Sequence, residues 1–256
     1  MKMKTIVIAQ GKGGVGKTAC AAHIAFYAKE LGKRVLVVDL DTGNLSITMA
    51  DAAIGIAASA LFGESPPSCL AAKQDSSGSG RLDLIGADTL LANLAYLPLE
   101  QALSRFVVNL NSLGDQYDLC VIDTAPGLGI ALASALHAAD AVISPVEMEA
   151  YSMEGIKTMM RTILNARTRN PKLSFLGILP SRVDRRNPRQ INHLAQVQQA
   201  HQQLLVPFVI GLRSSVAEAL ALGVPVWTLR KTSARAAAVE MRALGDYVVT
   251  KMGVTP

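Results

Sequence analysis

The feature that most constrains the fold is the octapeptide Gly-Lys-Gly-Gly-Val-Gly-Lys-Thr at residues 11–18. It has the spacing G-x-x-x-x-G-K-[ST], with a short apolar run before it (Thr5–Gln10) and a helix-spaced segment after it (Thr18–Leu31). In such a loop the glycines let backbone N–H groups face a phosphate, and the helix start adds its positive end. Lys17 supplies charge to the β- and γ-phosphates, and Thr18 places a hydroxyl on Mg²⁺. The motif therefore predicts a nucleotide-phosphate site.

Strand and helix patterns alternate along the whole chain, which predicts a three-layer α/β fold with a doubly wound, mostly parallel, twisted sheet flanked by helices. We expect one domain over residues 1–256, with a Pro/Ser/Gly-rich surface loop at 64–81. Further strands are predicted at Val35–Asp39, Leu82–Gly86, Tyr117–Asp123, Ala141–Val146, Leu173–Pro180 and Pro207–Ile210. Further helices are predicted at 47–62 (Ala-rich), 88–113 (split at Pro98), Ile130–Ala139, Ser152–Arg169, Pro188–Gln203, Ser215–Leu222 and from Thr232 to near Gly253, with Ser152 and Thr232 as caps.

Composition excludes several classes of protein. Half of the residues are hydrophobic, so the chain can bury a core, and only 4% are aromatic, so aliphatic residues must build it. No uninterrupted apolar run approaches the ~18 residues that a membrane span needs. The three cysteines, Cys20, Cys69 and Cys120, have no metal-site spacing, and we expect buried or idle thiols in a reducing cytoplasm.

Positive charge is concentrated in the second half of the chain. Residues 1–128 carry 10 Lys/Arg and 12 Asp/Glu, whereas residues 129–256 carry 15 and 8. Eight of those basic residues lie between positions 161 and 189, against one acid, Asp184. For any single charge a solvated face is the plainer interpretation, but an excess on one side favours a polyanionic partner.

A second lysine inside the loop, Lys12, is not needed by an ordinary phosphate loop. With it the sequence resembles the deviant Walker A family, which includes ParA partition ATPases, MinD and the nitrogenase iron protein. In that family the early lysine reaches the nucleotide of the other subunit in a dimer. The resemblance therefore implies that Lys12 acts in trans.

Three acids at predicted strand ends extend the resemblance. Val37-Val38-Asp39-Leu40-Asp41 is similar to the family's second motif, in which the later acid, Asp41 here, positions the attacking water and Asp39 holds the magnesium shell. Val121-Ile122-Asp123-Thr124-Ala125-Pro126 resembles its Walker B strand and D-x-x-P switch, so that Asp123 would bind Mg²⁺ through water. The family usually reads P-Q-G-N after the second acid, and this chain has the shorter Thr42-Gly43-Asn44.

The resemblance covers nearly the whole chain and is strongest to IncC-type ParA proteins of plasmid partition. Segments such as Ser144-Pro145-Val146-Glu147 and Gly211-Leu212-Arg213-Ser214-Ser215 match its middle and later parts. It implies a weak, partner-stimulated ATPase that uses ATP and Mg²⁺ and closes a homodimer on ATP. It also implies non-specific binding of double-stranded DNA, release by a ParB-type (KorB-like) centromere-binding protein, and a cytoplasmic, nucleoid-associated location. No helix-turn-helix domain fits before Thr5, so we expect no operator binding by this chain alone.

The candidate site residues fall into four groups. The catalytic candidates are Lys12, Lys17 and Asp41, and the metal candidates are Thr18, Asp39 and Asp123. The nucleotide candidates are Gly11, Lys12, Gly13, Gly14, Val15, Gly16, Lys17, Thr18 and Ala19, with Arg182 and Pro207 at the base, where ordinary strand-end packing is nearly as good an interpretation. Arg186 matches the family's DNA-contacting arginine, unless it merely pairs with Asp184; Arg185, Arg189, Arg213, Arg230, Lys231 and Arg235 are weaker DNA candidates.

Two other classes of function stay open on the sequence alone. A MinD-like ATPase would bind a membrane, but the C-terminal segment 246–256 holds one lysine and no basic stripe. A ParA-like ATPase that positions a non-DNA cargo would use the same motifs. A redox or synthetase relative would need cluster cysteines or a small-molecule pocket, and neither is evident in the sequence.

Overall fold

A computed structural model describes residues 2–41, 43–67, 80–127, 129–149 and 152–254. Its centre is a seven-stranded sheet in which every pair of neighbouring strands is parallel, in the order β3-β4-β2-β5-β1-β6-β7. The predicted α/β class and its parallel sheet are confirmed. The strands are β1 (Lys4–Ile8), β2 (Arg34–Leu40), β3 (Ala53–Ala57), β4 (Arg81–Gly86), β5 (Leu119–Thr124), β6 (Ala141–Val146) and β7 (Ser174–Pro180).

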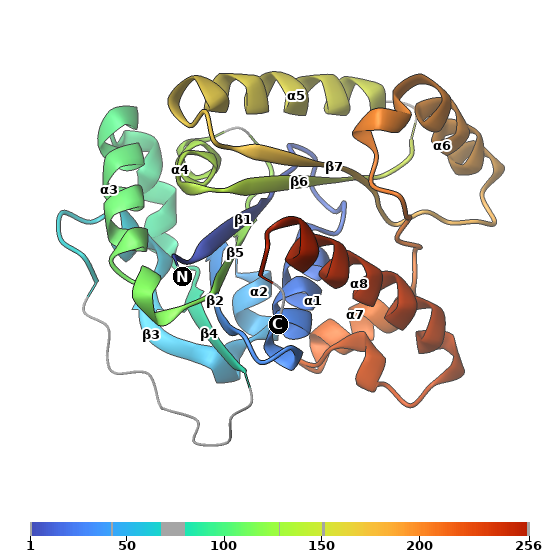
Figure 1. Ribbon diagram of the computed structural model, residues 1–256, viewed down its shortest axis with the longest axis horizontal. Helices are drawn as coiled ribbons and strands as arrows, with labels where there is room; N and C mark the ends of the chain where they lie inside the picture. The colour runs from blue at the N-terminus through green and yellow to red at the C-terminus, as the bar shows by residue number, and fades with distance from the viewer. Residues whose placement is uncertain (1, 42, 68–79, 128, 150–151, 255–256) are drawn as a thin grey trace.

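Helices cover both faces of this sheet (Figure 1). On one face α1, α7 and α8 pack against alternate residues such as Ile6, Ile8 and Val37, and on the other α3, α4 and α5 pack against Val7 and Leu36. The helices are α1 (Lys17–Glu30), α2 (Asn44–Thr48), α3 (Leu99–Asn111), α4 (Ile130–Ala138), α5 (Ser152–Arg169), α6 (Pro188–His201), α7 (Ser214–Ala221) and α8 (Thr232–Lys251). Short 3₁₀ turns are η1 (Ala50–Ala52), η2 (Ala58–Phe62), η3 (Thr89–Tyr96), η4 (Gly114–Gln116), η5 (Gln202–Leu204) and η6 (Val226–Thr228).

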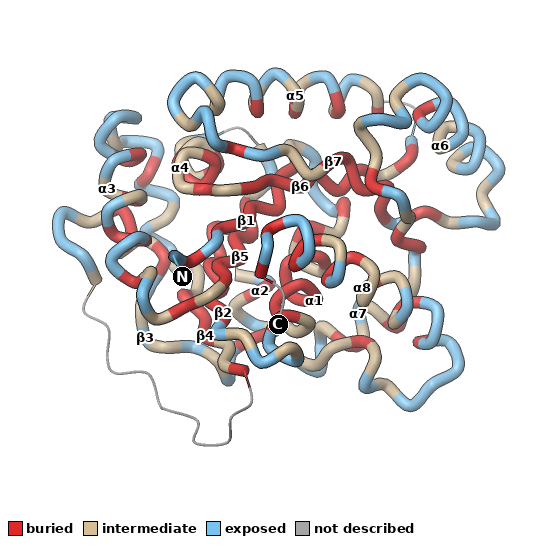
Figure 2. The backbone as a smooth tube through the Cα atoms, viewed as in Figure 1, coloured by how far each residue is buried: buried red, intermediate tan, exposed pale blue. Residues whose placement is uncertain are grey.

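The central strands are apolar on both faces because both faces are covered. All six residues of β5 and of β6 are buried, and the tube in Figure 2 is red along these strands. A sheet of this kind must satisfy its backbone through the ladder while its side chains fill two cores at once. This is why the sequence showed continuous apolar runs here and no alternation.

The predicted Ala-rich helix at 47–62 is wrong. That stretch contains the end of α2, then η1, strand β3 and η2. Gly55 has φ of +77°, a left-handed conformation that a helix interior does not allow. Ile54 and Ile56 alternate with exposed alanines and pack against the core formed by α3 and α4, so the local period is two.

Three smaller expectations also differ from the structure. Residues 207–210 form no strand and are joined to the sheet region by isolated bridges at Leu205 and Gly211. Thr232 is the first residue of α8 and makes no capping hydrogen bond. The Ser152 hydroxyl bonds to the backbone of Glu147 and Glu149, which precede α5, and is not an N-cap. The predicted loop at 64–81 lies largely outside the described residues.

The topology fixes where a ligand can bind. From β1 the chain moves across β5 to β2 on one side, while β6 lies on the other side of β1. At such a switch point the loops beyond the carboxyl ends of the strands diverge and leave a crevice. The loops after β1, β2, β5 and β6 all meet at this edge.

Among the described residues no helix is long and apolar enough to span a membrane.

Candidate functional site

The phosphate loop lies between β1 and α1, as predicted. Gly16, which precedes α1, has φ of +92°, and a side chain there would approach the Ser181 hydroxyl to 3.0 Å, so glycine is required for both conformation and space. The Gly11 carbonyl accepts a hydrogen bond from the Gly127 N–H at 3.1 Å, and the Gly11 N–H donates to the Gln10 side chain at 2.7 Å. The loop is therefore tied to the segment that follows β5 before any ligand arrives.

Lys17 is preorganised inside this loop. The residue is only 5% exposed, and its ammonium group donates to the Lys12 carbonyl at 3.4 Å. Burial lowers the pKa of Lys17, and the charges of Asp123 and Asp41 oppose that shift. A desolvated ammonium group is stabilised by charge-assisted hydrogen bonds to an anionic ligand, and a phosphate can provide them.

Asp123 and Thr18 form the most evident cation site in the chain. The Thr18 hydroxyl donates to Asp123 Oδ2 at 2.6 Å, and Asp123 is fully buried. The other carboxylate oxygen, Oδ1, is buried with no hydrogen-bond partner among the described residues. Burial is the main cause that raises the pKa of Asp123 to about 7. An orphaned, desolvated carboxylate beside a hydroxyl is the arrangement that a hard divalent ion, with its shell of water, would satisfy.

Both carboxylate oxygens of Asp39 accept hydrogen bonds from the loop after β2. Its Oδ2 accepts hydrogen bonds from the Ser46 N–H at 2.8 Å and the Ser46 hydroxyl at 2.7 Å, and its Oδ1 accepts one from the Asp41 N–H at 3.0 Å. The Ser46 hydroxyl also accepts from the Ala87 N–H at 2.8 Å. Asp39 and Ser46 thus hold the loop after β2 against the end of β4. Ser46 was not predicted as a site residue, and its only signal in the sequence is its position shortly after the second acid.

Asp41 directly follows β2 and lies at the same edge of the sheet as Asp123. In the register of β2 and β5, Asp39, two residues before Asp41, pairs with Asp123. Asp41 is half-buried and contributes to the electrostatics of Lys17 and Asp123. It lines a cavity of about 1020 Å³ whose other walls, such as Leu91 and Ile130, are largely apolar. Asp41 is therefore close enough to the phosphate loop for its charge to act on Lys17; Thr42, which follows it, lies outside the described residues.

Lys12 contacts carboxylates of its own chain. Its ammonium group lies 3.2 Å from Glu147 Oε2 and 2.5 Å from Glu149 Oε2. Hydrogen bonding to Glu149 is the main cause that raises the pKa of Lys12. Glu147 also accepts a hydrogen bond from Arg182 Nε at 2.8 Å. Glu147 was not singled out in the sequence, although it directly follows β6, the same strand-end position as the acids that were.

The two candidates for the base are not brought together. Arg182 lies beside Gly16, and its φ of +55° makes it the single non-glycine residue with positive φ in the described part of the chain. Pro207 lines another cavity, of about 680 Å³, with Pro180, Phe208 and Gln202, and no phosphate-loop residue lines it. Arg182 is therefore well placed for a nucleotide and Pro207 is a more remote candidate.

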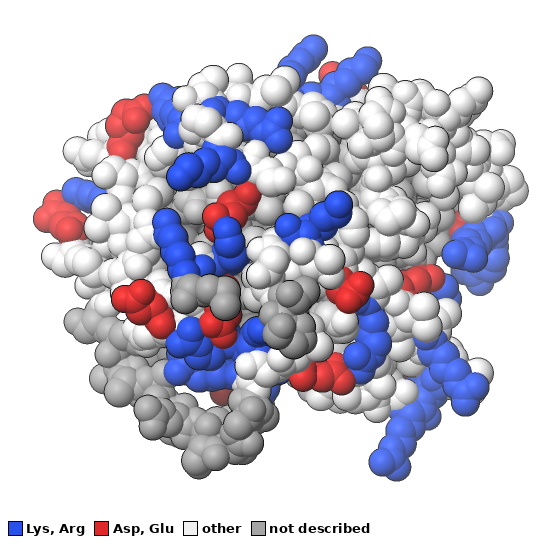
Figure 3. Space-filling model, in the orientation of Figure 1, with Lys and Arg blue, Asp and Glu red and all other residues white. Residues whose placement is uncertain are grey.

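The basic candidates divide into paired and unpaired side chains. Arg186 is paired with Asp184 through contacts of 3.0 and 3.1 Å, Arg213 with Glu240 at 2.6 Å, and Lys231 with Glu218 at 2.5 Å. The Arg186 side chain is 88% exposed and that of Asp184 is half-buried, so the pair is largely open to solvent, weak and open to competition. Within the described ranges no ion pair or side-chain hydrogen bond is made by Arg185, Arg189, Arg230 and Arg235. In Figure 3 blue side chains project at the lower right, where Figure 1 places the loop between α7 and α8.

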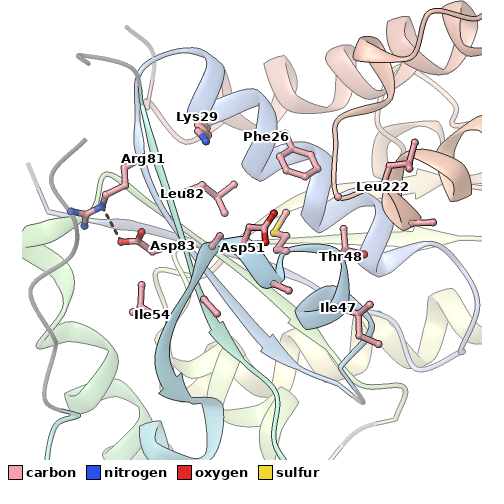
Figure 4. A pocket seen from close by; sticks show the side chains of 16 residues that line it. Phe26, Lys29, Ile47, Thr48, Asp51, Ile54, Arg81, Leu82, Asp83 and Leu222 are labelled. Atoms are coloured by element: carbon pink, nitrogen blue, oxygen red, sulfur yellow. Dashed lines mark ion pairs between the residues drawn. The ribbon is translucent and has the colours of Figure 1, made fainter. Parts of the chain in front are cut away.

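A further cavity lies away from the phosphate loop. It has a volume of about 670 Å³ and lies between α1, α2, the starts of β3 and β4, and the end of α7 (Figure 4). The ion pair of Arg81 with Asp83, at 2.9 Å, closes one side, and Phe26 and Leu222 line another. Asp83 also accepts a hydrogen bond from the Tyr117 hydroxyl at 2.7 Å, so these polar groups already serve the fold.

Two of the three thiols are accounted for. Cys20 and Cys120 are buried and unbonded, and burial raises the pKa of Cys20 to about 12. Cys69 lies outside the described residues. Within the described ranges no group of three or more His, Cys, Asp or Glu side chains could hold a metal ion by itself. A magnesium ion here would therefore depend on water and a ligand's phosphates for most of its shell.

The parallel sheet, the phosphate loop at its switch point and the acids after β2 and β5 define a P-loop nucleotide-binding protein. The comparisons make this more specific. A family model described as an AAA domain matches residues 3–175. An IncC protein of Escherichia coli is 51% identical over 99% of this chain and 71% of its own length. The chromosome-partitioning ATPase Soj of Thermus thermophilus is 38% identical over 72% of each chain.

Solved structures agree with this assignment. A cobyrinic acid a,c-diamide synthase of Mycobacterium smegmatis, with bound ATP analogue and magnesium, has a TM-score of 0.77 and 28% identity over 98% of this chain and 96% of that one. A plasmid partition protein of Borrelia burgdorferi bound to AMPPNP, at 23% identity, has a TM-score of 0.76 over 98% of this chain and all of the other. The chain belongs to the ParA/MinD family of P-loop ATPases and is similar to its IncC members.

Proposed function

We propose that this chain is a ParA-type partition ATPase, which binds ATP with Mg²⁺, closes a homodimer and then binds double-stranded DNA without sequence preference. The single observation that carries the proposal is the convergence of two phosphate-loop lysines, Lys12 and Lys17, with Asp41 and Asp123 at one edge of the sheet. Phosphoryl transfer depends on positioning and electrostatics, and these four groups supply both.

The residues fit a magnesium nucleotide. Thr18 and Asp123 would hold the ion, since Asp123 Oδ1 is buried and lacks a partner among the described residues. Bound magnesium would neutralise charge on the β- and γ-phosphates. Asp39 has both oxygens engaged by Ser46 and Asp41, so we assign it first to holding the loop after β2. One acceptor position stays open on Asp39 Oδ1, through which Asp39 would also hold the magnesium shell.

The chain's own side chains then have separable roles. Lys17 stays on the phosphates from binding to hydrolysis, because it is buried within the loop. Asp41 orients the attacking water by accepting a hydrogen bond from it. Lys12 is on the exposed side of the loop, with a side chain 53% exposed, so it is the lysine that can reach a second subunit.

DNA binding is assigned to the basic second half of the chain. Among the DNA candidates, Arg185, Arg189, Arg230 and Arg235 are those that could contact a phosphate backbone without breaking an ion pair among the described residues. Closing a dimer would present two such sets together. A ParB-type (KorB-like) partner that stimulates hydrolysis would reset the cycle, and the protein would work in the cytoplasm on the nucleoid.

A salt titration of DNA binding tests the proposal. Filter binding to duplexes of unrelated sequence is measured with ATP, with ADP and without nucleotide, and we expect tight binding with ATP alone. On duplex DNA each lost phosphate contact should lower the slope of log affinity against log salt by about 0.9. The double variant Arg185→Ala/Arg189→Ala should therefore bind all duplexes more weakly, with a flatter slope.

The matched control is Lys29→Ala, an exposed lysine on α1 in the acidic half of the chain, which should leave the slope unchanged. Binding by wild type without ATP would contradict the switch. Flotation with anionic liposomes, run in parallel, separates this function from that of a membrane ATPase: ATP-dependent flotation with no DNA binding would contradict a DNA partition role.

A further inference from the structure

We propose that Glu147 and Glu149 form a latch that holds Lys12 inside its own subunit, so that each subunit must release Lys12 before it can act on a second one. The inference rests on the proposed function, because it concerns the step in which an ATP-bound dimer closes. It predicts that these two glutamates oppose dimer formation, although they lie beside the nucleotide site.

The contacts define the latch. The ammonium group of Lys12 lies between Glu149 Oε2, at 2.5 Å, and Glu147 Oε2, at 3.2 Å. The second oxygen of Glu147 accepts from Arg182 Nε at 2.8 Å, so one carboxylate bridges the phosphate loop and the segment after β7. The Glu147 carboxylate is 15% exposed, whereas that of Glu149 is 50% exposed. Glu147 is therefore the more desolvated of the two carboxylates, and Glu149 is the more exposed to solvent.

The backbone that carries the two glutamates is itself fixed. The Ser152 hydroxyl lies 2.5 Å from the Glu147 carbonyl and 2.6 Å from the Glu149 carbonyl, one of which accepts its single proton, and it accepts from the Glu149 N–H at 2.6 Å. The Glu149 N–H also donates to the Glu147 carbonyl at 3.0 Å. These hydrogen bonds hold the backbone of Glu147 and Glu149 without any contribution from Lys12.

Charge explains why the latch must open. A lysine that serves a phosphate of another subunit cannot stay within 3.2 Å of two carboxylates of its own. The triphosphate is the stronger anion, so ATP in a facing subunit competes for Lys12, whereas an empty site offers nothing in exchange. The latch therefore stabilises the monomer when no nucleotide is bound. Closure of the dimer then has to offset the free energy needed to release Lys12.

Arg182 connects the latch to the nucleotide's own site. Its backbone has φ of +55°, a conformation that costs free energy in a residue other than glycine and is kept only where its surroundings enforce it. Its side chain lies beside Gly16 at the start of α1 and reaches Glu147. Arg182 Nε contacts Oε1 of Glu147 and the Lys12 ammonium group contacts Oε2, so one carboxylate holds both cations at once and joins the latch to the start of α1.

The latch itself is tested in the nucleotide-free chain through the reactivity of Lys12. An amine-reactive reagent is applied under limiting conditions, and modification of Lys12 is followed by mass spectrometry, with the exposed Lys29 as internal standard. Glu147→Gln and Glu149→Gln should each raise the rate at Lys12 about two- to fivefold, the range that follows from the worth of partly exposed ion pairs. A merely structural glutamate would not change the reactivity of one lysine.

The consequence is tested by ATP-dependent dimerisation in analytical ultracentrifugation, in a background that carries Asp41→Ala to prevent turnover. A dimer releases two latches, so the effect of one variant enters twice. Glu147→Gln should strengthen the dimer about 4- to 25-fold, the square of the effect in one subunit. Lys12, Glu147, Glu149 and Glu154 all line one cavity of about 490 Å³. The matched control is Glu154→Gln, which removes the same charge from this cavity but has no ion pair in the described part of the chain.

The outcomes are distinguishable. Unchanged reactivity of Lys12 in both variants overturns the latch, whatever the protein does with ATP. Weaker dimers in Glu147→Gln than in Glu154→Gln also overturn it, because Glu147 would then serve the dimer and not oppose it. A wild-type chain that forms no dimer with ATP overturns the proposed function, whereas enhanced Lys12 reactivity in the variants would still report the contact within the subunit.

Discussion

His23 should make the stability of this protein depend on pH in a way that a variant can isolate. The residue lies on α1, directly behind the phosphate loop, and is completely buried. Its Nε2 accepts a hydrogen bond from the Val226 N–H at 3.1 Å, and a backbone N–H can only donate. The ring proton must therefore be on Nδ1, which lies 2.8 Å from the Ala19 carbonyl and donates to it. A second proton on Nε2 would break the bond to Val226.

The magnitude follows from the burial of the ring. Burial lowers the pKa of His23 to about 4, against 6.5 for an exposed histidine. Because the unfolded chain then binds the proton more tightly, the free energy of unfolding is unaffected by this ring above about pH 7 and falls as the pH drops from about 6.5 to about 4. Each tenfold difference in proton affinity is worth about 1.4 kcal/mol, so the loss approaches about 3 kcal/mol.

The assay is urea unfolding at intervals between pH 4 and 8, without nucleotide and with EDTA. The pH dependence of wild type alone is not informative, because Asp123 has an opposite effect on the free energy of unfolding in the same pH range. The pKa of Asp123 is raised to about 7, so the folded state binds this proton more tightly than the unfolded state does and loses stability as the pH rises. The difference between wild type and His23→Gln removes the contribution of Asp123. That difference should shrink by about 3 kcal/mol from pH 7 to pH 4.

A control separates titration from the loss of packing. Val226→Ala weakens the same junction between α1 and η6 but removes no titrating group, so its curve should run parallel to that of wild type. If the difference between wild type and His23→Gln is constant from pH 4 to pH 7, the ring does not titrate as the geometry requires, and the reasoning is refuted.

Three further predictions concern the nucleotide site. Lys17→Ala should lower ATP affinity by at least about tenfold in calorimetry, because it removes the buried cation on the phosphates, and unchanged affinity would contradict the phosphate-loop assignment. Asp41→Ala should bind ATP and form dimers yet hydrolyse about 100-fold more slowly, since its carboxylate acts on water; normal turnover of phosphate would show that the shortened loop has moved this role elsewhere. Asp123→Asn should bind ATP with little dependence on Mg²⁺, and a full magnesium response in isothermal titration would exclude Asp123 as its holder.

The chemistry of this protein could be predicted from its sequence because it is written in short, contiguous motifs. Residues 11–18 need only a strand before them and a helix after them to form a phosphate loop, and both followed from local patterns. Asp41 and Asp123 could be expected at the same edge because parallel strands point their carboxyl ends the same way. The alternation of strand and helix likewise determined the class of fold.

Local patterns failed where tertiary contacts outweighed propensity. The alanine-rich stretch 47–62 favours a helix by composition, yet β3 pairs there with β4, and Ile54 and Ile56 pack against the α3–α4 core. Residues 207–210 are apolar enough for a strand, but only isolated bridges beside them join the sheet region. In both places the secondary structure depends on whether the segment can pair with a free edge of the sheet. Periodicity along the chain does not show which edges are free.

The sequence by itself determined that a nucleotide site exists and which residues are its principal charges. Only the tertiary structure decided how those charges are held before a ligand arrives. Lys12 meets Glu147 across 135 residues, and His23 meets Val226 across 203. The contact of Lys12 with Glu147 depends on the spatial order of the strands in the sheet, because β6 lies next to β1 in space and far from it along the chain. A carboxylate becomes a partner for a distant lysine only once the topology has brought their strand ends together.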